Sequence, residues 1–129
     1  MTVVTRERPV RAVVIDDTQD IRDLLSMVLT RNGMDVVGQA GDGQAGVELV
    51  RAERPDLVLL DLAMPVMDGI EALPLIRELV PDAKIIVLSA FAGAVSEQVL
   101  EWGADGYLQK GTPLKTIVAY LEDSLADRA

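Results

Sequence analysis

Residues 57–62 read LVLLDL, an aliphatic run that Asp61 interrupts near its end. Strands with one face in water alternate apolar and polar side chains, whereas strands buried on both faces of a parallel sheet are apolar throughout. This segment therefore predicts a central strand of a parallel sheet with a carboxylate near its end. Further strands are predicted from Val-, Ile- and Leu-rich runs at residues 10–15, 34–40, 84–90 and 106–109.

Helical patterns separate these runs. The first is the clearest, because apolar residues recur at the i, i+3, i+4, i+7, i+8 spacing of one helical face and Gly33 follows where the helix should stop. The residues on that face are Ile21, Leu24, Leu25, Val28 and Leu29.

The second helix is predicted to start at Asp42 as its cap and to end before Pro55. Its inward residues are predicted to be Ala45, Leu49 and Ala52.

The third predicted helix begins at Asp68 and Glu71, which have the spacing of a capping box, and Pro74 should bend it. The fourth, at residues 95–102, is short and weakly patterned. The fifth is predicted to have Thr112 as its cap and Pro113 as its first residue. Its buried face is predicted to consist of Leu114, Ile117, Val118 and Leu121.

Strict alternation of five strands and five helices predicts an α/β fold, a parallel sheet with helices on both faces. The alternation alone does not give the strand order; the flavodoxin-like order 2-1-3-4-5 is the usual one for a sheet of this size. With 129 residues one domain is expected, comprising residues 10–126, an extension at 1–9 and a tail at 127–129.

Composition narrows the chemistry. The chain has no cysteine and no histidine, so thiolate sites are excluded and oxygen-bound hard cations are favoured. A net charge of -9 argues against direct nucleic-acid binding. No apolar run reaches the roughly 18 residues of a membrane span, and the N-terminus lacks a signal-peptide core. A cytoplasmic protein without membrane contact is expected.

Polar residues follow the apolar runs at the strand ends, where parallel sheets bind ligands. These residues are Asp16, Asp17, Asp61, Ser89 and Lys110. Carboxylates a few ångströms apart repel by roughly 3 to 4 kcal/mol per pair at an effective dielectric near 20. A cation would relieve that cost, and Mg²⁺ fits an all-oxygen donor set.

Together these segments resemble the receiver domain of two-component response regulators, the CheY-like proteins. The resemblance rests on Asp16-Asp17, residues 61–69 (DLAMPVMDG), Ser89-Ala90 and residues 106–110 (GYLQK), and covers nearly the whole chain. Receivers of the kind joined to helix-turn-helix transcription regulators have a similar Gly-Tyr-Leu before the lysine.

The resemblance implies a phosphorylated signalling switch rather than a metabolic enzyme. Asp61 would accept a phosphoryl group from a sensor histidine kinase, and the domain would catalyse its own phosphorylation and dephosphorylation. Lys110 would assist, Ser89 would bond the phosphoryl group and Tyr107 would turn inward behind it. Mg²⁺ would be held by Asp16, Asp17, Asp61 and the carbonyl of Ala63. The face around the fourth helix and fifth strand would change, and the partner would be an effector protein or an output domain.

Two departures from the resemblance are evident. Gly111 follows Lys110, where many receivers have a proline in a cis bond. Ala63 and Phe91, each two residues past a site residue, present an apolar pair that favours slow hydrolysis of the phosphorylated state.

Other functions fit the residues less well. A phosphatase of the haloacid-dehalogenase kind needs a second aspartate where Ala63 stands, and a nucleotide or flavin binder needs a glycine-rich loop where Asp16 and Asp17 stand. A docking domain independent of phosphorylation keeps the fold without the chemistry. The sequence leaves open whether the receiver is free-standing or part of a longer regulator, and whether it dimerises on phosphorylation.

Overall fold

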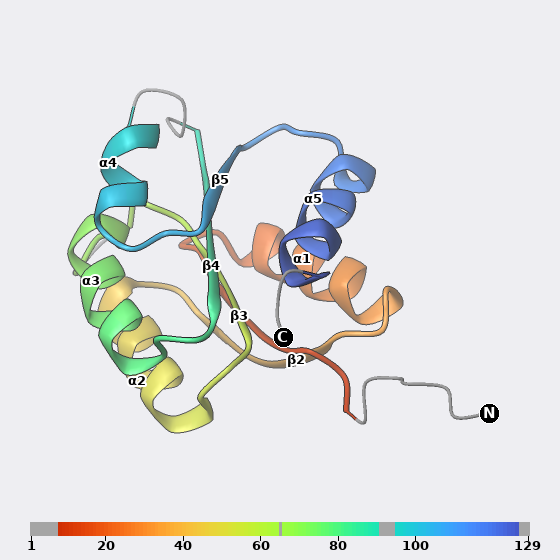
Figure 1. The fold of residues 1–129 in the computed structure, drawn as a ribbon, viewed down its shortest axis with the longest axis horizontal. Coiled ribbons are helices and arrows are strands. Elements are labelled where there is room, and N and C mark those ends of the chain that lie inside the picture. Colours follow the sequence, from red (N-terminus) through yellow and green to blue (C-terminus); the bar gives the residue numbers. More distant parts are fainter. Residues whose placement is uncertain (1–7, 65, 91–94, 127–129) are drawn as a thin grey trace.

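The computed structural model describes residues 8–64, 66–90 and 95–126. Its strands form one parallel sheet in the order β2-β1-β3-β4-β5, which confirms the expected order 2-1-3-4-5 (Figure 1). The strands are β1 (Arg11–Ile15), β2 (Asp35–Ala40), β3 (Leu57–Leu60), β4 (Lys84–Ser89) and β5 (Gly106–Gln109). The helices are α1 (Gln19–Arg31), α2 (Gly43–Glu53), α3 (Gly69–Leu79), α4 (Ser96–Glu101) and α5 (Leu114–Ala126).

The helices cover the two faces of the sheet, with α1 and α5 on one side and α2, α3 and α4 on the other (Figure 1). Each layer has its own apolar core. Val13, Val58 and Ile85 belong to the cluster under α2, α3 and α4, whereas Val14, Leu59 and Ile86 belong to the cluster under α1 and α5. Neighbouring residues of one strand thus face opposite layers, which explains why the central strands are apolar throughout.

Local signals set the helix starts. The carboxylate of Asp42 accepts the backbone N–H of Ala45 at 2.8 Å, and that of Asp68 accepts the N–H of Glu71 at 2.8 Å. Both caps were predicted from the sequence. α2 ends at Glu53, before Pro55, and Gly33 follows α1 with a φ of 85° that favours glycine.

Two predictions of helix packing were wrong. In α2, Ala52 is exposed, and Gly46, Val47 and Val50 face the core, with Ala45 and Leu49 at its margin. In α1, Leu24 is exposed. Apolar spacing gives a helix its period, but the side that packs on the sheet follows from the entry angle of the chain.

The start of α5 also differs from the prediction. The helix begins at Leu114, which is exposed, and the carbonyl of Pro113 accepts the N–H of Ile117. Pro113 therefore stands just before the helix, not at its first position. The hydroxyl of Thr112 donates to the carbonyl of Gln109 at 2.6 Å, away from the helix. Ile117, Val118 and Leu121 are buried as expected.

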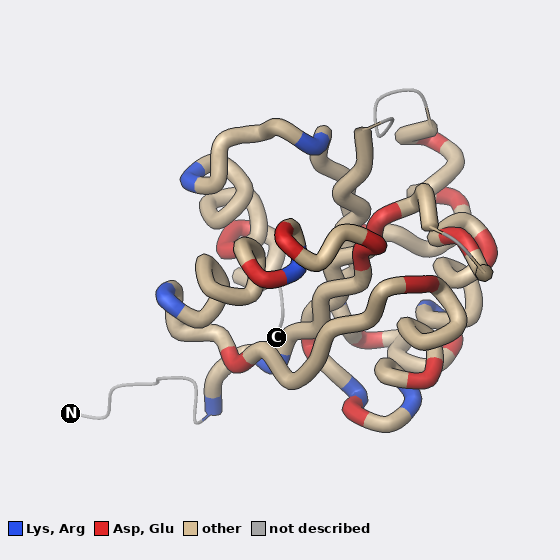
Figure 2. The backbone as a smooth tube through the Cα atoms, turned by 180° about the vertical axis from the view of Figure 1, so that it is seen from behind, with Lys and Arg blue, Asp and Glu red and all other residues tan. Residues whose placement is uncertain are grey.

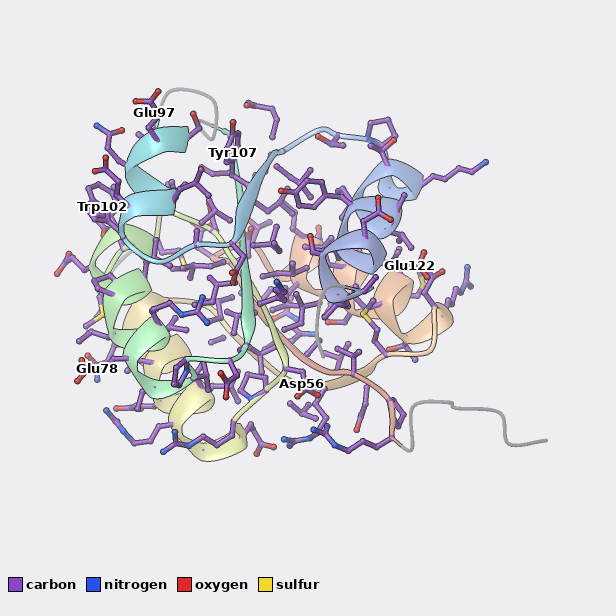
Figure 3. The ribbon with its side chains drawn as sticks, in the orientation of Figure 1. Asp56, Glu78, Glu97, Trp102, Tyr107 and Glu122 are labelled. Carbon is purple, nitrogen blue, oxygen red and sulfur yellow. The ribbon has the colours of Figure 1, made fainter. Side chains whose placement is uncertain are left out.

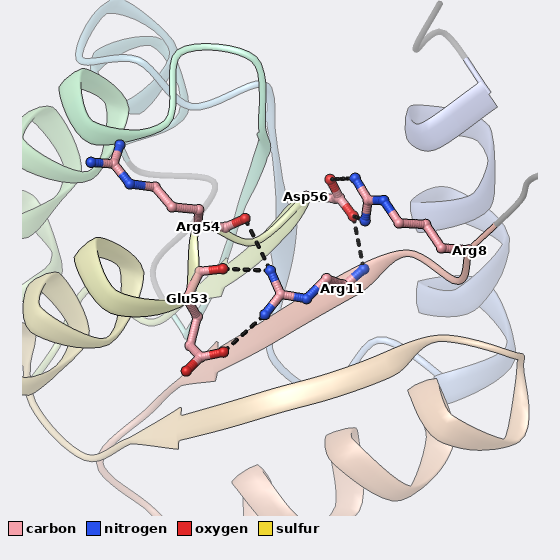
Figure 4. Close-up of polar contacts among 5 residues, drawn as sticks. All are labelled: Arg8, Arg11, Glu53, Arg54 and Asp56. Carbon is pink, nitrogen blue, oxygen red and sulfur yellow. Dashed lines mark hydrogen bonds and ion pairs between the residues drawn. The ribbon is translucent and has the colours of Figure 1, made fainter.

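An ionic network secures the amino ends of the central strands (Figure 4). Asp56 is buried and accepts from the Arg8 guanidinium at 2.8 Å and from the Arg11 backbone N–H at 2.9 Å. The Arg11 side chain pairs with Glu53 at 2.8 Å. Arg8, which precedes β1, is thereby tied to the body of the domain. In the described ranges, no helix is long and apolar enough to cross a membrane.

Candidate functional site

Asp16 and Asp61 lie side by side because they follow adjacent strands. The backbone N–H of Asp61 donates to the Ile15 carbonyl at 2.9 Å, and that of Asp16 donates to the Ala40 carbonyl at 3.0 Å. The sheet hydrogen bonds thus continue one residue past β1 and β3. Asp17 completes the group, and one carboxylate oxygen from each of the three residues lies within 4.8 Å of the others.

The three acids differ in burial. The exposed fraction is 2% for Asp16 and 3% for Asp61, whereas Asp17 is exposed. One oxygen of Asp16 accepts the Thr18 N–H at 2.9 Å, and one oxygen of Asp61 accepts the Ala63 N–H at 3.3 Å. Two buried carboxylates therefore share the carboxyl edge of the sheet, each held by a nearby backbone amide.

Lys110 brings a positive charge to this pair from the end of β5. Its Nζ lies 2.9 Å from Asp16 Oδ2 and 3.2 Å from Asp61 Oδ2. Burial lowers the pKa of this lysine, but the hydrogen bonds and charges of Asp16 and Asp61 outweigh that effect, so its pKa is raised. The ammonium group is therefore firmly cationic.

For Asp61, in contrast to Lys110, the charged form is disfavoured. Burial raises its pKa, the neighbouring charge of Asp16 raises it further, and Lys110 only partly offsets both. The single positive charge of Lys110 thus does not fully compensate for the repulsion between the carboxylates around it. A second cation at this edge would relieve the remaining repulsion.

The donor set fits a hard divalent cation. The three carboxylates converge, and no nitrogen or sulfur ligand is available because the chain has no histidine or cysteine. Carboxylate, carbonyl and water oxygens are the ligands that Mg²⁺ takes in proteins. Ala63, whose carbonyl is the further expected ligand, is exposed two residues after Asp61.

Gly69 allows α3 to start against the backbone of Asp61. A Cβ at this position would lie 2.1 Å from the Asp61 carbonyl oxygen, and the Gly69 N–H donates to the Leu62 carbonyl at 2.8 Å. The sequence predicted a helix cap at Asp68 but did not indicate a close backbone approach at Gly69. The structure shows a close approach that any other residue would prevent.

Val66, in the loop between β3 and α3, has a φ of 67° and is 84% exposed. A β-branched residue seldom adopts this backbone conformation. Nothing in the sequence signalled it, since valine normally indicates a strand.

Ser89 and Tyr107, the two expected switch residues, lie near the site in different environments. Ser89 is buried at the end of β4, and the Lys110 N–H donates to its carbonyl at 2.9 Å. Tyr107 is 36% exposed and stands near the upper end of α4 in Figure 3. Ser89 also lines an open cleft of about 450 Å³ with Leu62, Ala63, Met64, Asp68, Ile70 and Val95.

The residue directly after Lys110 is a glycine rather than a proline. Gly111 has a φ of 93°, a conformation that favours glycine, and the described residues contain no cis peptide bond. Phe91, expected beside the site, lies outside the described residues. Gln109 was not anticipated from the sequence, and its side-chain amide donates to the carbonyl of Ala90.

A comparison with protein families matches residues 12–122 to the response regulator receiver domain. The chain belongs to this family. Among curated proteins, the receiver domain is 38% identical over 109 residues to the transcriptional regulatory protein LnrK of Bacillus subtilis, covering 82% of this chain and 50% of that protein. It is 41% identical over 113 residues to the response regulator MprA of Mycolicibacterium vanbaalenii, covering 86% of this chain and 48% of that protein. The chain thus spans about half the length of these relatives.

Solved structures agree with the family. The signal receiver domain of the putative response regulator NarL from Mycobacterium tuberculosis is 35% identical, with a TM-score of 0.85 and coverage of 94% of this chain and 99% of that one. A complex of CheX and CheY with BeF3 and Mg from Borrelia burgdorferi matches at 26% identity and a TM-score of 0.85. The match covers 90% of this chain and 89% of that one. The CheY-like fold and the response-regulator family are therefore both established for this receiver domain.

Proposed function

We propose that the receiver domain accepts a phosphoryl group on Asp61 from the phosphohistidine of a sensor histidine kinase. The observation that carries this proposal is the placement of Lys110 between the buried carboxylates of Asp16 and Asp61, at 2.9 and 3.2 Å. A structural ion pair needs one acid. Two buried acids, with a third beside them, suit a site whose charge changes during its reaction.

In the proposed reaction a carboxylate oxygen of Asp61 attacks phosphorus, the P–N bond breaks, and its electron pair returns to the imidazole. Asp61 becomes an acyl phosphate. Lys110 would stabilise the phosphoryl oxygens, because its cationic form is secured by Asp16. The Ala63 N–H orients the nucleophile through its bond to Asp61 Oδ1.

Mg²⁺ would supply the missing positive charge during transfer. Asp16, Asp17, Asp61 and the Ala63 carbonyl would hold it. The convergence of the three carboxylates and the raised pKa of Asp61 support this assignment. The Borrelia burgdorferi CheY relative, whose structure contains BeF3 and Mg, supports it independently.

The switch would act through Ser89 and Tyr107. A phosphoryl group adds nearly two negative charges, enough to bias a loop with two positions. The buried Ser89 hydroxyl would bond the phosphoryl group, and the exposed Tyr107 would turn inward, which would reshape the surface around α4 and β5. The output is proposed to be an effector protein or a domain outside this chain, with dimerisation as one form of response.

The proposal is tested by intact mass after incubation with acetyl phosphate, with and without Mg²⁺. Wild-type protein is expected to gain one phosphoryl group only when Mg²⁺ is present, and Asp61→Asn is expected to gain none. Asp56→Asn is the matched control, because Asp56 is also buried but lies at the opposite end of β3. It should be phosphorylated like the wild type.

Phosphorylation that persists in Asp61→Asn would reject Asp61 as the acceptor. No adduct in the wild type, together with no binding of beryllofluoride, would reject the phosphorylation mechanism. A docking domain that works without phosphorylation would then explain the fold better.

A further inference from the structure

Gln109 lies on the side of the sheet that carries α4. Side chains alternate along a strand, and Gly106 and Leu108 face α5: a Cβ on Gly106 would meet the Tyr120 hydroxyl, and Leu108 packs on the cluster under α1 and α5. Tyr107 and Gln109 therefore point to the opposite side.

From there the Gln109 side chain reaches the residue after β4. Its Nε2 donates to the carbonyl of Ala90, the first residue beyond Ser89. Ser89 and Gln109 are direct partners in the β4–β5 ladder. The side-chain bond thus extends the contact between the strands by one residue, to the start of the connection that leads to α4.

Both ends of this bond adjoin site residues. Ala90 follows Ser89, and Gln109 precedes Lys110, whose N–H donates to the Ser89 carbonyl at 2.9 Å. The backbone of Gln109 is itself fixed, because its carbonyl accepts the Thr112 hydroxyl at 2.6 Å. The movable end of the bond is therefore Ala90.

We propose that Gln109 is a positioning residue that holds Ala90 against β5 in the unphosphorylated state and so opposes the switch. This inference rests on the proposed function. Ser89 must move toward Asp61 to bond a phosphoryl group, and Ala90 must follow it, away from β5. The hydrogen bond from the Gln109 side-chain amide to the Ala90 carbonyl is lost in that movement.

Gln109 and Tyr107 lie on the same side of the sheet, which supports the inference. Tyr107 is two residues away on the same side and exposed, which is its outward position. In the proposed switch, its inward turn accompanies the movement of Ser89 and Ala90. A bond that holds Ala90 in place therefore opposes both parts of the switch.

The test is the affinity of the full chain for beryllofluoride in the presence of Mg²⁺, with the bound species counted by ¹⁹F NMR. Gln109→Met keeps the length and neutrality of the side chain but cannot donate. A net hydrogen bond of ordinary strength corresponds to a change in affinity of about two- to tenfold. Gln109→Met should therefore bind beryllofluoride more tightly by that factor.

Three controls make the result specific. Gln44→Met alters an exposed glutamine on α2 whose side chain bonds Glu48, and should leave the affinity unchanged. Gln109→Asn, too short to reach Ala90, should reproduce the tightening. In a Ser89→Ala background, where no hydroxyl draws the loop inward, the effect of Gln109→Met should largely disappear.

The outcomes separate the two proposals. If the wild type neither gains a phosphoryl group from acetyl phosphate nor binds beryllofluoride, the proposed function fails and the positioning role fails with it. If the wild type binds but Gln109→Met and Gln109→Asn bind equally well or more weakly, the positioning role is overturned while the proposed function stands. Tightening that persists in full with Ser89→Ala would also overturn it, because the effect would then not pass through the switch hydroxyl.

Discussion

At the scale of single residues, the site consists of charges that the fold holds together at a cost. Asp16 and Asp61 are nearly inaccessible to water, and Lys110 compensates for only part of their repulsion. The raised pKa of Asp61 expresses that imbalance. Groups needed for chemistry are commonly placed where they lower stability.

This cost predicts that Asp61→Asn stabilises the protein in metal-free buffer at neutral pH, by about 0.5 to 2 kcal/mol. The folded protein holds the Asp61 proton more tightly than the unfolded chain, so ionisation of Asp61 reduces the free energy of unfolding. Lys110 keeps Asp16 as its partner in the variant. Urea denaturation with a chelator present measures the difference.

The pH dependence has a definite sign. The unfavourable contribution of Asp61 is complete above its raised folded-state pKa and vanishes as the pH falls to the ordinary aspartate value of 3.8. The advantage of Asp61→Asn should therefore shrink in acid. Asp35→Asn, which alters an exposed aspartate at the start of β2, should change stability by no more than about 0.5 kcal/mol. An advantage that grew in acid would contradict the charge explanation.

The residues that form the site could be predicted from the sequence because each of them lies at the end of an apolar run that predicts a strand. The sequence placed Asp16, Asp61 and Lys110 at one edge of the sheet, and the structure brings them within ion-pair distance. Gln109 could not be predicted. An exposed glutamine has no characteristic pattern, and its partner is a backbone carbonyl that only the β4–β5 register brings near.

At the scale of helices and strands, boundaries were predicted better than faces. Asp42 and Asp68 cap their helices as expected because a cap depends on local sequence. The exposure of Ala52 and Leu114 was not foreseen. Which side of a helix is buried depends on how it crosses the sheet. In α2 the closest approach is at Gly46, where a Cβ would lie 2.9 Å from Ile15 atoms.

The cap of α2 gives a prediction at this scale. Asp42→Ala leaves the Ala45 N–H without its side-chain acceptor and should lower the free energy of unfolding by about 0.5 to 2 kcal/mol. Asp42→Asn retains an acceptor and should cost much less. Thermal or urea unfolding of both variants compares them directly. Equal losses would show that charge, rather than the cap, stabilises the start of α2.

At the scale of the whole molecule, acidic residues outnumber basic ones, and the two ends of the sheet differ in how well their acids are paired. The chain has 21 acidic and 12 basic residues, and Figure 2 shows the acidic positions spread widely over it. At the amino ends of the strands, the acids Asp56 and Glu53 are paired with Arg8 and Arg11. At the carboxyl ends, three acids converge, and among the described residues Lys110 is the cation that forms ion pairs with them. The unbalanced end of the sheet is therefore the end that should bind a cation.

This asymmetry predicts that Mg²⁺ stabilises the receiver domain through one end of the sheet alone. A ligand that binds only the folded state at 100 times its dissociation constant adds about 2.7 kcal/mol to the free energy of unfolding. The gain should appear on titration with MgCl₂ at constant ionic strength, and should be largely lost in Asp16→Asn and Asp61→Asn. Asp35→Asn removes the same charge from the other end of the sheet and should keep the gain. If Asp35→Asn lost it as well, the stabilisation would reflect screening of net charge, and the carboxyl edge would not be a specific metal site.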